Sequence, residues 1–133
     1  MGEIKNGCIF HWEGYQFADG EKADKYLVIL GCKEKCNYLA VVATSQPKKR
    51  KFEPGCNAAM GYYHIPGGRK DWFPKDTWLL LSDPREIHPG EFLKFAMAKA
   101  IEHRGQLRDD VANAIRNCLK RCDDVSAYHL SLL

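Results

Sequence analysis

The sequence lacks both a long apolar run and a strong charge of either sign. No window of its 133 residues reaches the roughly 18 apolar residues of a membrane span, and its first six residues lack the charged-then-apolar order of a secretory signal. Twenty lysines and arginines against seventeen aspartates and glutamates give a formal charge of +3, too small to make the whole surface a trap for polyanions. We therefore expect a cytoplasmic protein without membrane contact, in which any nucleic-acid site depends on local clusters of cations.

Several motifs of catalysis and cofactor binding are also missing. The chain has no Gly-x-Ser-x-Gly elbow and no phosphate-binding loop, because residues 67–70 are too few and no Ser or Thr follows them. We expect a hairpin turn there instead. Cofactors are not expected.

Six cysteines are present, but the tight CxxC turn of many zinc sites is not. Cys32 and Cys36 flank a charged turn, whereas Cys118 and Cys122 have the spacing of one helical face. In a reducing compartment such thiols serve mainly as small apolar packing groups, which is the reading we favour. A zinc site built from the four thiolates is the alternative.

The first two thirds of the chain read as a small all-β domain. Short apolar runs rich in β-branched and aromatic residues alternate with turn residues. The expected strands cover residues 7–12, 25–31, 37–44, 62–66 and 77–82, with a short piece at 85–87. The charged residues 33–35 suit a hairpin turn.

The last third changes period. Leu93, Met97 and Ile101 recur every four residues, which predicts a helix from about residue 90 to 103, with Gly105 as its stop. An apolar stripe from Leu107 to Val125 predicts a second helix, with Cys118 and Cys122 among its core residues. The expected fold is mainly β with C-terminal helices, in a single domain that divides into a barrel at about 5–88 and a helical part at about 90–127.

The order of five short stretches resembles the MazF/PemK family of bacterial toxin endoribonucleases. These are residues 7–12, with Cys8 in place of the usual acid, ADKYLVIL at 23–30, AVVATSQPK at 40–48, DTWLLLSDPREI at 76–87, and AI-x-x-CL at 114–119. The resemblance covers most of the chain. It implies an SH3-like barrel of five to six strands, usually a homodimer, that binds single-stranded RNA in a groove where an antitoxin segment competes.

The resemblance also implies which residues act on RNA. Lys25 and Thr44 match the family's catalytic arginine and threonine, and Ser45 lies beside Thr44. Cleavage without a metal needs a proton acceptor, a proton donor and a charge that stabilises the phosphate. Lysine departs from the family here, because an ammonium does not grip two phosphate oxygens in a fixed fork. Without the resemblance, Thr44 is a strand-end hydroxyl bonded to nearby backbone and Lys25 is a solvated edge charge.

Further residues are candidates for RNA binding. The expected backbone contacts are Lys48, Lys49, Arg50, Lys51, Arg69, Lys70 and Arg85, and the expected base-stacking rings are Trp72 and Phe73. A solvated loop is the alternative for the run at 48–51. His11, His64 and Trp78 read as structural residues.

Two classes of function follow. The leading one is a toxin-like endoribonuclease of a type II toxin-antitoxin system that cleaves single-stranded RNA without a metal. The alternative is a catalytically inactive SH3-like barrel that acts as an RNA- or protein-binding module. A peptide-reading domain that uses the aromatic loop residues is a third option.

Overall fold

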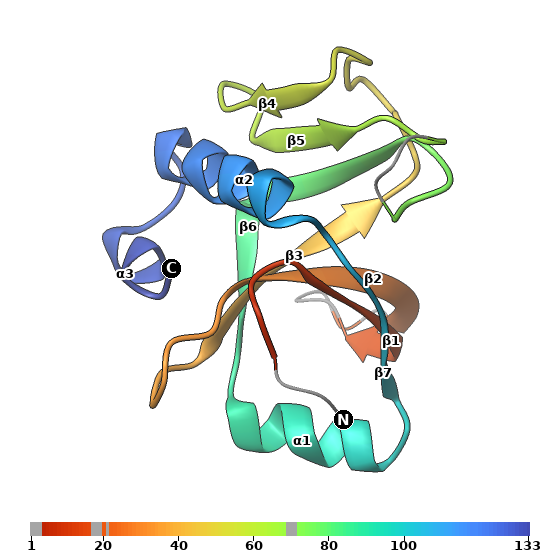
Figure 1. The fold of residues 1–133 in the computed structure, drawn as a ribbon, viewed down its shortest axis with the longest axis vertical. Coiled ribbons are helices and arrows are strands. Elements are labelled where there is room, and N and C mark those ends of the chain that lie inside the picture. The colour runs from red at the N-terminus through yellow and green to blue at the C-terminus, as the bar shows by residue number, and fades with distance from the viewer. Residues whose placement is uncertain (1–3, 17–19, 21, 69–71) are drawn as a thin grey trace.

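The computed structural model describes residues 4–16, 20, 22–68 and 72–133, which form seven strands and three helices. In chain order these are β1 (Cys8–Gln16), β2 (Lys22–Gly31), β3 (Tyr38–Thr44), β4 (Gly55–Asn57), β5 (Tyr62–Ile65), β6 (Thr77–Ile87), α1 (Pro89–Met97), β7 (Ile101–Gln106), α2 (Asp109–Arg121) and α3 (Ala127–Ser131). All strands belong to one antiparallel sheet in the order β4-β5-β6-β3-β2-β1-β7. Figure 1 shows the β4–β5 hairpin at one end of the molecule and α1 at the other.

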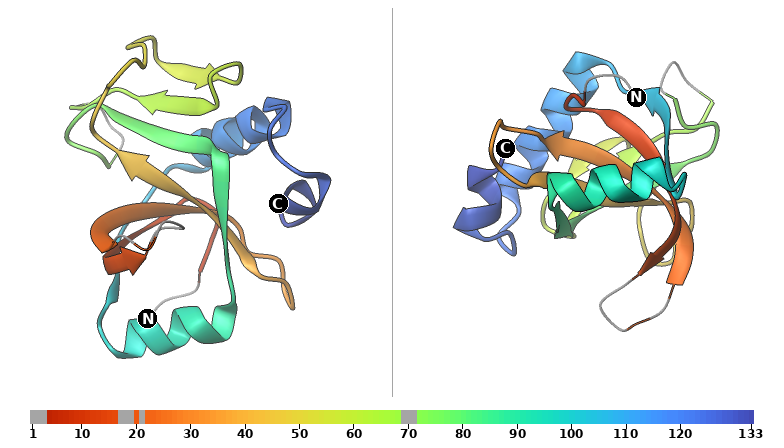
Figure 2. Two further views of the ribbon diagram at one scale, coloured as in Figure 1. Left: turned by 180° about the vertical axis from the view of Figure 1, so that it is seen from behind. Right: turned by 90° about the horizontal axis from the view of Figure 1, so that it is seen from below.

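The expected mainly β fold with C-terminal helices is confirmed, whereas the expected closed barrel is not. β4 and β7 lie at the two edges of the sheet, and no pairing joins them within the described residues. The sheet is strongly bent, as the view from behind in Figure 2 shows. The structure therefore establishes an open, bent antiparallel sheet.

The central strands are buried on both faces. Along β2, Leu27 and Ile29 face one apolar cluster while Val28 and Leu30 face the other, because successive side chains of a strand point to opposite sides. The two clusters have different covers: α2 packs over the face of Val28 and Leu30 through residues such as Ile115, and α1 covers the face of Leu27 and Ile29. This double burial explains why these strands read as continuous apolar runs.

The expected helix at 90–103 is too long. α1 ends at Met97, Lys99 adopts a left-handed φ of 63°, and residues 101–106 form β7, which pairs with β1. The apolar repeat also predicted the wrong buried face for this helix. Leu93 and Met97 are exposed, and Phe92 is the buried residue of α1. The apolar residues that recur every four positions continue past the end of α1 by coincidence, since Ile101 belongs to β7. Gly105 also lies within β7 and does not stop a helix.

Other boundaries shift for local reasons. The pieces expected at 77–82 and 85–87 form one strand, β6, because its pairing with β3 skips from Leu80 to Arg85 and leaves a bulge that contains Pro84. A proline fits there because it has no N–H to give to a ladder. The sequence analysis did not predict β4, which follows the basic run at 48–51, or α3.

Two of the six cysteines are not free thiols, contrary to our expectation. A disulfide joins Cys56 in β4 to Cys118 in α2, across 62 positions of sequence. Cys118 and Cys122 are both buried, as expected for core residues. The described residues include no group of three or more side chains placed to hold a metal ion, and the four-thiolate reading has no support in this arrangement.

Candidate nucleic-acid interface

A hollow lies where β2 begins and β3 ends. These strands are antiparallel, with Tyr26 opposite Ala43, so the preceding Lys25 and the following Thr44 are brought to the same edge of the sheet. The hollow has a volume of about 640 Å³ and is hereafter the strand-end pocket. It is lined by Asp24, Lys25, Tyr26, Ala43, Thr44, Ser45, Gln46, Trp72, Phe73, Pro74, Lys75 and Thr77.

The pocket brings together five of the predicted site residues: Lys25, Thr44, Ser45, Trp72 and Phe73. They come from β2, from β3, from the turn that follows it and from the β5–β6 connection. Lys25 and Thr44 are half-buried, and Ser45 is exposed. Segments that are distant in sequence therefore supply one surface.

Thr44 has the local bond that its structural interpretation requires. Its hydroxyl oxygen accepts a hydrogen bond from the backbone N–H of Gln46, at 3.2 Å. A hydroxyl that accepts one bond still has its own proton to donate. Thr44 can therefore shape the turn and also donate to a ligand oxygen in the pocket.

Aromatic rings form one wall of the pocket. The ring centroids of Tyr26 and Trp72 are 5.4 Å apart, and those of Trp72 and Phe73 are 5.1 Å apart. Trp72 packs directly on the backbone of β7 at Gly105, where any Cβ would overlap the indole. Phe73 is only 4% exposed and belongs to the core, so its predicted role as a stacking ring is wrong, whereas Trp72 is half-buried and lines the pocket.

The β5–β6 connection, which carries Trp72, is held at its base by a buried histidine. His64 stacks on Trp78, and its Nε2 lies 3.3 Å from Asp76 Oδ1, while its Nδ1 lies 3.1 Å from the carbonyl oxygen of Glu53. Asp76 also accepts a hydrogen bond from the backbone N–H of Gly67 at 3.0 Å. His64 is therefore structural, as expected from its strand position. It ties the pocket wall to Glu53, which lies two residues after the run at 48–51.

The sequence reading did not single out four polar lining residues: Asp24, Gln46, Lys75 and Thr77. Asp24 and Gln46 adjoin predicted residues in sequence, but nothing in the spacing of the four indicated that they share one pocket. Asp24 Oδ1 accepts from the backbone N–H of Gly14 at 2.9 Å, which fixes the carboxylate beside Lys25. Asp24 thus places a proton acceptor at the pocket.

The run at 48–51, hereafter the basic segment, is ordered by backbone bonds. The Lys51 N–H donates to the Tyr62 hydroxyl at 2.9 Å, and its carbonyl accepts from Trp78 Nε1 at 3.0 Å. Lys48 and Lys49 are exposed, and Arg50 donates to the carbonyl of Gln46. The segment is therefore not a loosely solvated loop, although three of its four cations, Lys48, Lys49 and Lys51, are exposed.

A second hollow adjoins the basic segment. It measures about 380 Å³ and is lined by Lys48, Lys49, Arg50, Met60 and Tyr62. Along the chain only Pro47 separates its first residue from Gln46 of the strand-end pocket. Pocket and basic segment are therefore consecutive parts of one surface.

The structure does not bring Arg85 to the pocket. It pairs with Ala40, four residues before Thr44 along β3, and its guanidinium binds Asp83 at 2.7 Å and lies over the ring of Tyr15. Its predicted contact with RNA therefore stays a prediction that lies outside the strand-end pocket. Arg69 and Lys70, two further predicted contacts, lie outside the described residues.

Comparisons with known proteins do not assign the chain. It matches no family model and no curated protein. Within the part of the chain that the structure describes, no helix is long and apolar enough to cross a membrane.

Proposed function

We propose that the chain is a toxin-like endoribonuclease that cleaves single-stranded RNA, with the scissile phosphate in the strand-end pocket. The observation that carries the proposal is the convergence of a lysine, two hydroxyls and an aromatic wall in one hollow: Lys25, Thr44, Ser45 and Trp72. The proposal includes the relationship to MazF/PemK toxins, a barrel-derived fold, a homodimer, a cytoplasmic location and an antitoxin partner, all suggested by the sequence resemblance.

The pocket has a group for each requirement of the reaction. In the proposed step the ribose 2′-OH attacks the adjacent phosphorus and the bond to the 5′ oxygen breaks, which leaves a 2′,3′-cyclic phosphate and a 5′-OH. Asp24 is the carboxylate among the described lining residues and accepts the 2′-OH proton. The hydroxyls of Thr44 and Ser45 donate to the phosphate oxygens as their charge grows.

The two lysines of the pocket complete the scheme. Lys25 neutralises charge on the phosphorane, and Lys75, on the β5–β6 side of the pocket, supplies the proton that the leaving 5′ oxygen takes up. An ammonium serves both purposes, since it carries charge and a transferable proton. Trp72 stacks on an unpaired base, which favours single strands over duplexes.

The basic segment contributes affinity. Successive phosphates of an extended RNA strand follow the chain from Gln46 to the exposed Lys48 and Lys49. Such contacts bind every sequence about equally and weaken as salt rises. The pocket is thus proposed to set rate and base preference, and the basic segment to set binding strength.

The test is cleavage of one labelled RNA, offered as a single strand and as a duplex, in buffer with a metal chelator. We expect the purified protein to cut the single strand and to leave cyclic-phosphate ends, Lys25→Ala and Thr44→Ala to cut far more slowly, and Lys94→Ala, an exposed control on α1, to cut normally. An intact single strand with wild-type protein, or equal rates for wild type and both pocket variants, contradicts the catalytic assignment.

The same surface supports a second function, a non-catalytic RNA-binding module. Lysine in place of the family's arginine and the lack of a histidine among the described lining residues favour it. RNA binding without cleavage in the same experiment, lost in a basic-segment variant, is the result that this alternative predicts.

A further inference from the structure

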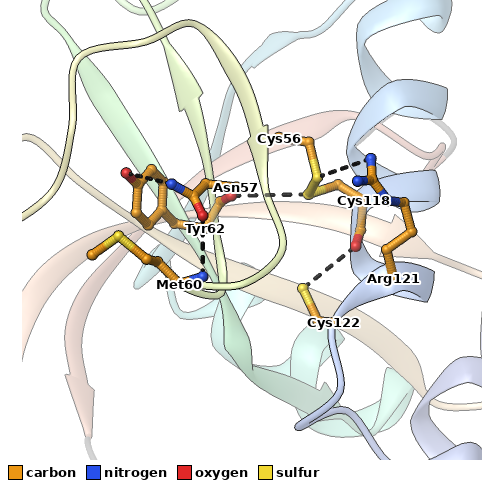
Figure 3. Close-up of a disulfide and its surroundings, with 7 residues drawn as sticks. All are labelled: Cys56, Asn57, Met60, Tyr62, Cys118, Arg121 and Cys122. Carbon is orange, nitrogen blue, oxygen red and sulfur yellow. Dashed lines mark hydrogen bonds between the residues drawn. A yellow bond between two sulfur atoms is a disulfide. The ribbon is translucent and has the colours of Figure 1, made fainter.

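The two sulfurs of the Cys56–Cys118 disulfide have different environments. Cys56 is exposed on the edge strand β4, and its Sγ lies 3.8 Å from Nη1 of Arg121 (Figure 3). Cys118 is 1% exposed in α2, and its Sγ lies 3.8 Å from the carbonyl oxygen of Tyr62. Thiol exchange requires direct approach of a thiolate to a sulfur atom, so an external thiolate reaches only the Cys56 side.

The hairpin that carries Cys56 also holds the basic segment. The Tyr62 hydroxyl accepts hydrogen bonds from the Lys51 N–H at 2.9 Å and from Asn57 Nδ2 at 3.1 Å. Asn57 Oδ1 in turn accepts from the N–H of Met60 at 3.1 Å, which closes the turn of the hairpin (Figure 3). Because Asn57 directly follows Cys56, the disulfide lies one residue from this network.

β4 is a short edge strand that also lies against α2. It spans three residues and, among the described strands, pairs with β5 alone, so the disulfide is its covalent tie to α2. β5, in contrast, pairs with four residues of β6 and buries Tyr62 and Ile65 in the interior. Loss of the tie therefore loosens β4 and the chain before it and leaves β5 in the sheet.

We propose that this disulfide is a thiol-exchange site for a dithiol reductant, entered at Cys56, and that its reduction releases residues 48–61 beside the candidate RNA site. The effect on RNA and the reducing compartment rest on the proposed function, whereas the exchange itself does not. In a reducing compartment disulfides are uncommon except where they respond to redox state, and the different exposure of the two sulfurs fits such a response.

The exchange proceeds in two steps. A thiolate of the dithiol attacks Cys56 Sγ, the bond between the two cysteines breaks, and Cys118 leaves as a thiolate that takes a proton from solvent. The second thiolate of the reductant then attacks the reductant's other sulfur, which is bonded to Cys56 in the mixed disulfide. Cys56 leaves as a thiolate and is also protonated. Two electrons and two protons pass to the protein, and the reductant becomes a disulfide. The Arg121 guanidinium favours both the approaching thiolate and the departing Cys56 thiolate.

Cys122 is a neighbouring thiol that does not compete in this exchange. Its Sγ lies one helical turn away, 3.4 Å from the carbonyl oxygen of Cys118 (Figure 3). Burial raises the pKa of Cys122, and the nearby Asp124 and Asp123 raise it further, so its sulfur stays protonated and unreactive. Cys122→Ser is therefore a matched control for changes at Cys56.

The experiment compares the oxidised protein with the same protein treated with dithiothreitol, a dithiol, or with glutathione, a monothiol. Alkylation of the unfolded samples should label four cysteines in the oxidised protein and all six after dithiothreitol, with little change after glutathione, because a buried Cys118 thiolate returns to the mixed disulfide. Trypsin should then cut the basic segment on the order of tenfold faster in the reduced protein, as expected for local opening.

Variants distinguish local opening at the disulfide from a general loss of stability of the fold. Cys56→Ser should be cut at the fast rate without reductant, whereas Cys122→Ser should stay slow until dithiothreitol is added. If Cys56→Ser does not fold, the reduced wild-type protein gives the same comparison. Equal trypsin rates for oxidised and reduced protein, or equal reduction by glutathione, overturn the proposal.

An RNA-binding measurement on the same samples separates the two proposals. We expect weaker binding after reduction. No RNA binding in either state counts against the proposed function, while the alkylation and trypsin results still decide the redox proposal. Equal RNA affinity in both states, with the segment released, overturns the claim that the disulfide regulates the site.

Discussion

At the scale of single residues, the proposed catalysis depends on Lys25, which stands where the MazF/PemK family, which the sequence resembles, has an arginine. Lys25 lies beside Asp24 in the pocket and delivers charge to the phosphate from one point. We expect Lys25→Arg to cleave RNA at least as well as wild type, because a guanidinium keeps the charge and adds a second donor. Lys25→Met, of similar length, should cleave about 10² to 10³ times more slowly, the usual effect of removing one stabilising donor. Single-turnover rates measure both, and a Met variant as fast as wild type contradicts the role of the charge.

A second residue makes a pH-dependent contribution to stability. Glu86 accepts hydrogen bonds from the Tyr128 hydroxyl at 2.7 Å and from Asn37 at 2.5 Å, which lower the pKa of its carboxyl below 4.5. A depressed pKa stabilises the fold above the unfolded value and loses that effect as pH falls through the folded one. Tyr128→Phe should therefore lower the melting temperature at pH 7 and do so progressively less below about pH 4. A difference that is constant from pH 7 to pH 3 contradicts the hydrogen-bond explanation.

At the scale of elements, the basic segment has a defined electrostatic signature. Lys48 and Lys49 are exposed, and each phosphate contact to a single strand contributes about 0.7 to the slope of log affinity against log salt. Lys48→Ala with Lys49→Ala should therefore lower the slope by about 1.4, by the same amount for unrelated RNA sequences. The exposed pair Lys94→Ala with Lys120→Ala is the control, and it should leave the slope unchanged. A slope equal to that of the control removes the segment from the interface.

The short helix α1 tests the corrected assignment of its buried face. Phe92 is 2% exposed and makes edge contacts with Phe10 at 4.9 Å and Tyr38 at 5.4 Å, whereas Leu93 is 52% exposed. Phe92→Ala should lower the free energy of unfolding by about 3–5 kcal/mol. Leu93→Ala, the matched control, should change it by less than about 0.5 kcal/mol. Urea titration measures both, and the reverse order supports the stripe that the sequence suggested.

At the scale of the whole molecule, the sequence predicts those strands and helices that local residue patterns determine. The runs at 25–31 and 37–44 are apolar enough to indicate strands, and the change of period after residue 107 indicates α2. The sequence does not show where long-range pairing replaces local preference. β7 forms through its pairing with β1, and β4 forms through its pairing with β5 and its disulfide bond to α2.

The candidate site was foreseeable only in part, for the same reason. The resemblance singled out Lys25 and Thr44, which an antiparallel register then brings to one edge of the sheet. Asp24 precedes Lys25 on β2, and Lys75 joins them through the connection of eleven residues between β5 and β6. Arg85 lies away from the pocket because β6 runs antiparallel to β3, so that the later residues of β6 pair with the early residues of β3 and Arg85 pairs with Ala40. Pairing register and bulges decide such placements, and short motifs do not record them.

The most direct test of the central claim measures cleavage rate and RNA affinity separately on one single-stranded substrate. Thr44→Ala should lower the single-turnover rate about 10² to 10³ times with little change in affinity, and Thr44→Ser should restore most of it. The Lys48 and Lys49 double variant should bind less tightly and cleave at the wild-type rate once saturated. Thr44→Ala that cleaves as fast as wild type, or loses affinity alone, contradicts a catalytic strand-end pocket.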